Sequence, residues 1–175
     1  MNVIDETLRA NKSYAKDFAF GDLLLPPALK LVVVACMDAR MDIYRILNLK
    51  PGDAHVIRNA GGIVTVDAMS SLLISQNLLG TKHVMIINHT ECGMLTFKDD
   101  ELRAKLQQNS GTDTIAPTRF YAFSDLEKNV REQIQKVKSH PWVAREITVR
   151  GFIYDVKTGT LREVAESRGR KAQKR

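Results

Sequence analysis

Both cysteines of this 175-residue chain stand where a run of apolar residues gives way to polar ones. Cys36 ends the run LKLVVVAC, residues 29–36, and Cys92 lies near the end of KHVMIINHTECG, residues 82–93, three residues after His89. Two thiolates and one imidazole form a recognised zinc ligand set, and a catalytic zinc site has three protein ligands with the fourth position left open. We therefore predict that Cys36, His89 and Cys92 bind zinc.

The cysteines have other interpretations. Two are too few for a disulfide framework, but free cysteine is among the residue types most often buried, so both could be inert core thiols. A cysteine nucleophile of the phosphatase type is expected to precede an arginine by six positions. Asp42 occupies that position after Cys36, and no glycine loop for a phosphate follows. The placement of both cysteines at the ends of apolar runs favours the metal site.

Asp38 and Arg40 follow Cys36 in the segment CMDAR. In extended or loop backbone, residues two apart direct their side chains to the same side. A guanidinium group that binds a carboxylate fixes its orientation and lowers its pKa. Our hypothesis is that Asp38 accepts a hydrogen bond from zinc-bound water or hydroxide while Arg40 holds Asp38 away from the metal. An ordinary surface ion pair is the alternative.

Three short apolar runs rich in Val and Ile, at residues 29–36, 54–62 and 82–93, must position these side chains. Such runs are typical of strands buried on both faces of a parallel sheet. Helical segments predicted at 41–49 and 65–80 lie between them, so the chain is expected to form an α/β fold around a mostly parallel sheet flanked by helices. Ligand sites of such sheets lie at the carboxyl ends of the strands, where the reactive residues occur.

The second run ends in RNAGG, residues 58–62. We expect Arg58 and Asn59 to brace the loops of the site rather than contact substrate. Gly61 and Gly62 are expected to permit close backbone approach at the turn into the next helix.

The second half of the chain is more polar. A helix is predicted near 98–107 and a loop at 109–118, and Ser124 with Glu127 forms a capping-box signature for a helix that Pro141 ends. The segment 147–164 alternates about KTG, which predicts one more strand and an edge hairpin. We expect a single domain, residues 1–175, with an N-terminal helical arm at 1–28 and a basic, flexible tail at 166–175.

Composition excludes several classes of protein. Hydrophobic residues make up 44% and charged residues 26% of the chain, as in ordinary soluble domains. The net charge is +6, and the last fifteen residues, with six Lys or Arg against two Glu, supply +4 of it, so a nucleic-acid surface is not expected. No apolar run approaches the roughly 18 residues that would span a bilayer. We expect a cytoplasmic protein that binds neither nucleic acid nor membrane.

The motifs CMDAR at 36–40, RNAGG at 58–62 and HTECGM at 89–94 resemble, in order and spacing, those of the compact branch of the β-class carbonic anhydrases. GFIYDVKTGTL, at 151–161, is similar to the late hairpin of that family. The resemblance implies that Cys36, His89 and Cys92 bind Zn²⁺ and that Asp38 and Arg40 form the catalytic dyad. The chain departs from the family at Glu91, where many members have Asp or a smaller residue, and at Asn88, where many have Gly.

The resemblance also implies a function. Zinc-bound hydroxide would attack CO₂, and the overall reaction would give bicarbonate and a proton, with activity that rises with pH. The resemblance also implies a homodimer or a multiple of dimers, whose active-site clefts lie at the subunit interface. Compact relatives include hydrolases of carbonyl sulfide or carbon disulfide with the same zinc set, which is the main alternative. A non-catalytic zinc-binding or interaction protein ranks lower, because a closed structural site would have no use for Asp38 and Arg40.

Overall fold

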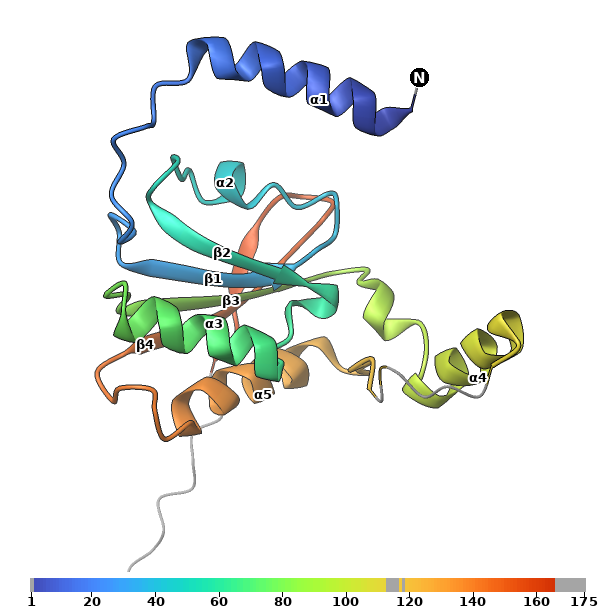
Figure 1. The fold of residues 1–175 in the computed structure, drawn as a ribbon. Helices are drawn as coiled ribbons and strands as arrows, with labels where there is room; N and C mark the ends of the chain where they lie inside the picture. The colour runs from blue at the N-terminus through green and yellow to red at the C-terminus, as the bar shows by residue number, and fades with distance from the viewer. Residues whose placement is uncertain (1, 113–116, 118, 166–175) are drawn as a thin grey trace, which may run out of the picture.

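The computed structural model describes residues 2–112, 117 and 119–165. Within these residues, five strands form one sheet in the order β2-β1-β3-β4-β5 (Figure 1). The strands are β1 Leu31–Cys36, β2 Ala54–Asn59, β3 His83–His89, β4 Thr148–Tyr154 and β5 Leu161–Glu163. The first four pair in parallel and β5 pairs antiparallel with β4. This arrangement confirms the predicted α/β fold, its mostly parallel sheet and its late hairpin.

Helices cover the two faces of the sheet unequally. Helices α3, Val66–Asn77, and α5, Leu126–Ser139, pack on one face, whereas the short helix α2, Ile43–Ile46, lies over the other (Figure 1). Helix α4, Asp99–Ser110, stands apart at the carboxyl-end side of the sheet. The predicted segment 41–49 is therefore mostly loop, since only one turn of it is helical.

The apolar run of β1 is buried on both faces, as its Val-rich sequence predicts. Val32 and Val34 belong to the core formed with α3 and α5, while Val33 and Ala35 belong to the core on the side of α2. All four side chains are at most 1% exposed. Because side chains of a strand alternate between its faces, β1 joins the two halves of the core and fixes the position of Cys36 at its end.

The start of α5 differs from the prediction. The N-cap residue is Asp125, whose carboxylate accepts a hydrogen bond from the backbone N–H of Lys128 at 2.9 Å, so the predicted capping box of Ser124 and Glu127 is wrong. Both residues are good N-caps and adjacent in the chain, so local sequence permits either one. The predicted end before Pro141 is confirmed, because the helix ends at Ser139.

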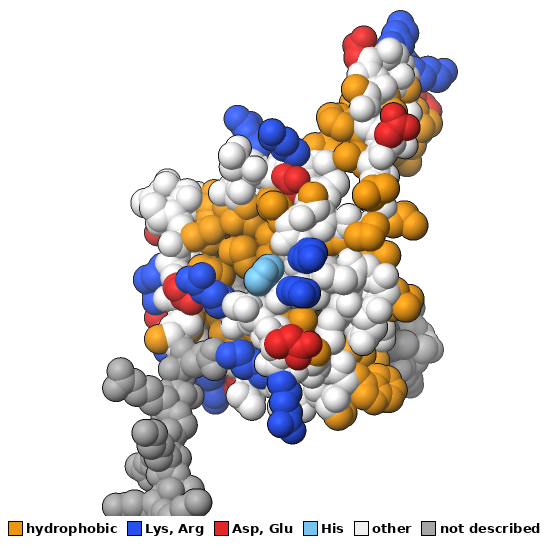
Figure 2. All heavy atoms as spheres, turned by 90° about the vertical axis from the view of Figure 1, so that its left-hand side faces the viewer, with side chains coloured by type: hydrophobic (Ala, Val, Ile, Leu, Met, Phe, Trp, Pro, Cys, Tyr) orange, Lys and Arg blue, Asp and Glu red, His pale blue; other side chains and the backbone are white. Residues whose placement is uncertain are grey.

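The first helix, α1, spans Val3–Tyr14, within the predicted N-terminal arm. Within the described part of the chain none of its residues is buried, and Val3, Ile4 and Leu8 are each more than half exposed. Figure 2 shows the segment projecting at the top of the molecule with hydrophobic side chains on its surface. None of the described helices is long and apolar enough to cross a membrane. The predicted tail 166–175, and residues 113–116 and 118 of the predicted loop, lie outside the described residues.

Candidate metal centre

The predicted zinc ligands meet at the carboxyl ends of two neighbouring strands. Cys36 is the last residue of β1 and His89 the last residue of β3, and these strands pair in parallel. Cys92 lies three residues after His89 and directly precedes the short 3₁₀ turn Gly93–Leu95. One ligand atom from each of the three residues lies within 4.8 Å of the other two, and all three residues are buried. This spacing is compatible with ligation of a single ion.

The ring of His89 is oriented by the backbone. Its Nδ1 lies 2.9 Å from the carbonyl oxygen of Thr90, so Nδ1 carries the proton and donates, and Nε2 has a free lone pair. Nε2 is buried and has no hydrogen-bond partner among the described residues. A buried polar atom without a partner is unfavourable, and a metal ion bound to it would remove that cost. The donor set, two sulfurs and this nitrogen, fits zinc.

The hydrogen bond between the two thiols shifts their pKa values in opposite directions. A hydrogen bond from Cys92 lowers the pKa of Cys36, with smaller contributions from His89 and from backbone amides, and these outweigh burial, which raises it. The same hydrogen bond and burial raise the pKa of Cys92. One of the amides is the N–H of Gly61, which donates to Sγ of Cys36 at 3.3 Å. Cys36 is therefore the more acidic of the two thiols, and a metal binds the deprotonated form.

Asp38 is held by Arg40 beside this cluster. Nε of Arg40 donates to Oδ1 of Asp38 at 2.9 Å and Nη2 donates to Oδ2 at 2.8 Å, while the backbone N–H of Arg40 donates to Oδ1 at 2.9 Å. The hydrogen bonds from the Arg40 side chain hold the pKa of Asp38 well below its usual range. Oδ2 of Asp38 lies 3.7 Å from Nε2 of His89. The two side chains thus form the predicted pair, and it faces the candidate ligands.

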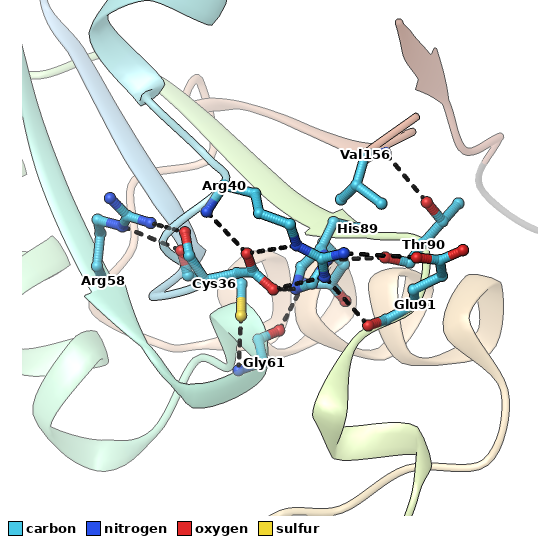
Figure 3. A network of polar contacts seen from close by, with 10 residues as sticks. Cys36, Arg40, Arg58, Gly61, His89, Thr90, Glu91 and Val156 are labelled. Carbon is cyan, nitrogen blue, oxygen red and sulfur yellow. Dashed lines mark hydrogen bonds and ion pairs between the residues drawn. The ribbon is translucent and has the colours of Figure 1, made fainter. Parts of the chain in front are cut away.

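Arg40 is itself held from the far side by Glu91. Nη2 of Arg40 donates to the carbonyl oxygen of Glu91 at 3.3 Å, and Nη1 lies 3.4 Å from its Oε2 (Figure 3). Oε1 of Glu91 pairs with Nζ of Lys157 at 2.6 Å. Glu91 has a φ of +57°, in the left-handed region, and both its side chain and its backbone carbonyl contact Arg40. Glu91, one of the two departures from the family motifs, therefore extends the charged pair, a role that its sequence position did not reveal.

Arg58 braces the loop that carries the pair. Its Nε donates to the carbonyl oxygen of Cys36 at 3.0 Å, and its Nη2 donates to that of Asp38 at 2.7 Å (Figure 3). Asn59 bonds both backbone polar groups of Ile63, accepting from its N–H at 2.8 Å and donating to its carbonyl at 2.7 Å. The bracing role expected for both residues is confirmed.

The glycines after β2 allow the close approach that was expected of them. Gly61 and Gly62 have φ values of +82° and +61°. A Cβ on Gly62 would lie 2.9 Å from the backbone nitrogen of Cys36. Only glycine fits this turn without strain.

A cavity of about 360 Å³ opens onto the candidate ligands. Besides Asp38 and the ligands, its walls are mainly apolar and include Met37, Ala60, Met94 and Phe97. The sequence motifs did not identify Met37, Met94 or Phe97 as lining residues, because their apolar side chains are indistinguishable from core residues in the sequence.

Comparison with known proteins decides the family. The family model for carbonic anhydrase matches residues 31–161. The chain is also 46% identical, over 94% of its length, to beta-carbonic anhydrase 1 of Mycobacterium tuberculosis, 99% of which is covered. The chain belongs to the β-carbonic anhydrase family. The family is metal-dependent, and this chain holds a Cys–His–Cys cluster that could bind a metal ion.

Other relatives agree with this assignment. A crystal structure of carbonic anhydrase from Streptococcus mutans superposes with a TM-score of 0.88 at 39% identity, covering 94% of this chain and 99% of that one. A carbon disulfide hydrolase of Saccharolobus solfataricus is 32% identical over 91% of this chain and 88% of its own length. The chain is thus also similar to a protein named for a different substrate, which is the alternative that the sequence analysis raised.

Proposed function

We propose that this chain is a zinc-dependent carbonic anhydrase that catalyses the reversible hydration of CO₂ to bicarbonate and a proton. One observation carries the proposal: ligand atoms of Cys36, His89 and Cys92, one from each, lie within 4.8 Å of one another, and the buried Nε2 of His89, beside a carboxylate in a fixed orientation, has no partner among the described residues. Cys36, His89 and Cys92 would hold the zinc. When bound, zinc lowers the pKa of coordinated water to about 7 and so supplies a nucleophile at neutral pH.

Asp38 is suited to orient that nucleophile. Each carboxylate oxygen can accept about two hydrogen bonds. Oδ1 accepts from both Nε and the backbone N–H of Arg40, whereas Oδ2 accepts one bond, from Nη2. The remaining acceptor site is therefore on Oδ2, the oxygen nearest to Nε2 of His89. Because its pKa is low, Asp38 accepts hydrogen bonds and does not donate them. It would therefore turn the proton of the nucleophile toward itself and leave a lone pair of the nucleophile's oxygen directed at the carbon of CO₂.

Arg40 has two roles in this arrangement. It keeps Asp38 ionised, and it holds both carboxylate oxygens, so Asp38 could ligate the metal only by breaking hydrogen bonds to the guanidinium group. We infer that this restraint keeps the fourth ligand position open to water. The ion pair of Glu91 with Lys157 supports Arg40 from the opposite side.

The cavity walls agree with the proposed substrate. CO₂ is small and carries no net charge, so it needs an apolar pocket more than it needs polar groups to fix it. The side chains of Met37, Met94 and Phe97 provide such walls next to the ligands.

We further propose that the protein is one domain that acts in the cytoplasm as a homodimer or a multiple of dimers. Helix α1 supports the assembly, because it exposes Val3, Ile4 and Leu8, and a helix of this length depends on packing for stability. A second copy of the chain is the partner proposed to cover that face. The two free thiols, which zinc binding requires, suit a reducing compartment. Sedimentation of the purified protein as a monomer would contradict the assembly.

Metal analysis combined with turnover measurements tests the central proposal. We expect about one zinc ion per wild-type chain, rapid CO₂ hydration in stopped-flow assays, and loss of both in Cys36→Ser. CO₂ hydration at the wild-type rate by a metal-free variant would overturn the proposal. Carbonyl sulfide and carbon disulfide are assayed side by side, and turnover of either one without CO₂ hydration would favour the alternative that the carbon disulfide hydrolase relative suggests.

A further inference from the structure

Three amide side chains are buried together between β3 and α5. Asn88 of β3 is 0% exposed, and Asn129 and Gln133 of α5 are 4% and 2% exposed. Burying an amide is unfavourable unless its polar atoms are hydrogen-bonded. Aliphatic residues at these positions would pack the interface of a helix and a sheet at a lower cost. The three amides therefore need an explanation that packing does not provide.

The amides form a chain of hydrogen bonds with one direction. Nε2 of Gln133 donates to Oδ1 of Asn129 at 2.8 Å, and Nδ2 of Asn129 donates to Oδ1 of Asn88 at 2.7 Å. Nδ2 of Asn88 then donates to the carbonyl oxygens of Gly61 and Gly62, at 2.8 and 3.3 Å. Each of the three amides donates a hydrogen bond to the next group in the series, and all these bonds run in the direction from α5 to the turn after β2.

The direction of this chain is set at its α5 end. Oε1 of Gln133 accepts from the backbone N–H of Val64 at 3.0 Å and from Nζ of Lys136 at 3.2 Å. With its oxygen occupied in this way, Gln133 can present only its NH₂ group to Asn129. Aligned hydrogen bonds in a low-dielectric interior strengthen one another. Helix α5 therefore determines which way the amide of Asn88 faces.

The turn that receives Asn88 is the one that donates to Cys36. The N–H of Gly61 points at Sγ of Cys36, 3.3 Å away (Figure 3). Gly62 is confined on both sides, since a Cβ there would lie 2.9 Å from both Nδ2 of Asn88 and the backbone nitrogen of Cys36. The turn thus has the candidate metal ligand on one side and the buried amide chain on the other.

We propose that Asn88, oriented by Asn129 and Gln133, is a positioning residue for the metal centre. It holds the carbonyl groups of Gly61 and Gly62 so that the N–H of Gly61 stays directed at Sγ of Cys36. This inference rests on the proposed role of Cys36 as a zinc ligand. A hydrogen bond to the sulfur fixes its direction and disperses its negative charge, and loss of an outer partner of this kind typically weakens metal binding by about 10- to 100-fold.

The substitution Asn129→Asp tests the chain without altering any group at the metal centre. The introduced carboxylate would face Oδ1 of Asn88, so the amide of Asn88 is expected to turn over and present its oxygen to the carbonyls of the turn. We expect zinc affinity, measured by competition with a chelator, to fall by about 10- to 100-fold. In the cobalt-substituted protein, the thiolate-to-cobalt absorption band should shift. Asn88→Ala should have at least as large an effect on both readouts.

Ile134→Ala is the matched control. Ile134 lies in the same helix, is 2% exposed and takes no part in the amide chain, so its truncation should lower Tm while zinc affinity and the cobalt spectrum stay as in the wild type. Wild-type affinity and spectrum in Asn129→Asp and Asn88→Ala would overturn the inference, as would an equal loss of affinity in Ile134→Ala. If either variant fails to fold, Gln133→Glu replaces it in the test. This substitution should also reverse the direction of the hydrogen-bond chain, from one residue further from the turn, and the same two readouts are measured. Absence of zinc binding by the wild type would instead refute the proposed function.

Discussion

Gly62 offers a sharp test of how tightly the turn packs against the candidate metal centre. Gly62→Ala should destabilise the protein in two ways. Its φ of +61° costs a non-glycine residue about 1–2 kcal/mol. The new Cβ would also lie 2.9 Å from the backbone nitrogen of Cys36 and 3.0 Å from the backbone carbon of Ala35. These atoms belong to β1, an interior strand paired on both sides, which cannot easily move, so overpacking should add about 1–3 kcal/mol.

Gly80→Ala separates the two contributions. Gly80 also has a positive φ, +72°, but a Cβ there would meet no atom within 4 Å. It precedes β3 and so lies at the amino end of the sheet, away from the metal centre. We expect Gly80→Ala to cost only the backbone strain of about 1–2 kcal/mol, against about 2–5 kcal/mol for Gly62→Ala.

Urea unfolding with excess chelator measures both losses, because bound zinc would itself add stability to the folded state. The dependence of the free energy of unfolding on urea should be unchanged, so that shifts in the midpoint report stability alone. Zinc affinity should fall in Gly62→Ala and not in Gly80→Ala. Equal destabilisation by the two substitutions would refute the reasoning, since it would mean that the turn moves aside at no cost.

Two further predictions follow from charged groups. Arg40→Met should retain zinc but lower kcat/KM for CO₂ hydration by about 100-fold, because the carboxylate of Asp38 loses its fixed orientation. Arg40→Lys should restore little of this activity, since lysine cannot donate two parallel hydrogen bonds to the carboxylate. Wild-type turnover in either variant would exclude the proposed role of Arg40. Asp99 accepts hydrogen bonds from the backbone amides of residues 120–122, which outweigh burial and lower its pKa. Its stabilising effect should therefore be complete above the unfolded pKa of about 3.9 and disappear as pH falls through the lower folded value. The stability difference between wild type and Asp99→Asn should shrink over that range, and a difference independent of pH between 6 and 3 would contradict this account.

Local sequence was sufficient for the strands of the sheet and for the candidate chemistry, but not for the helix predicted at 41–49, of which only one turn forms. The runs of Val and Ile predict strands buried on both faces, and β1 is buried in this way. The second run instead forms the edge strand β2, in which only Ala54 is fully buried. Cys36 and His89 fall at strand ends in the sequence itself, and parallel pairing brings such ends to one edge. Asp38 and Arg40 are two residues apart, so their contact is local. The error at the start of α5 is local too, because Ser124 and Asp125 are both competent N-caps and only the direction of the chain entering the helix selects between them.

Tertiary structure decided what lies around these residues. Nothing in the sequence relates Asn88 to Asn129, 41 residues later, or Glu91 to Lys157, yet the first pair orients the turn beside Cys36 and the second supports Arg40. These contacts depend on the order of strands in the sheet and on which face of α5 rests on β3. Residue spacing records local geometry and average burial, whereas the partner of a buried amide is set by elements that meet only once the chain has folded. By itself, therefore, the sequence determined which side chains could hold a metal, and the fold determined what holds those side chains.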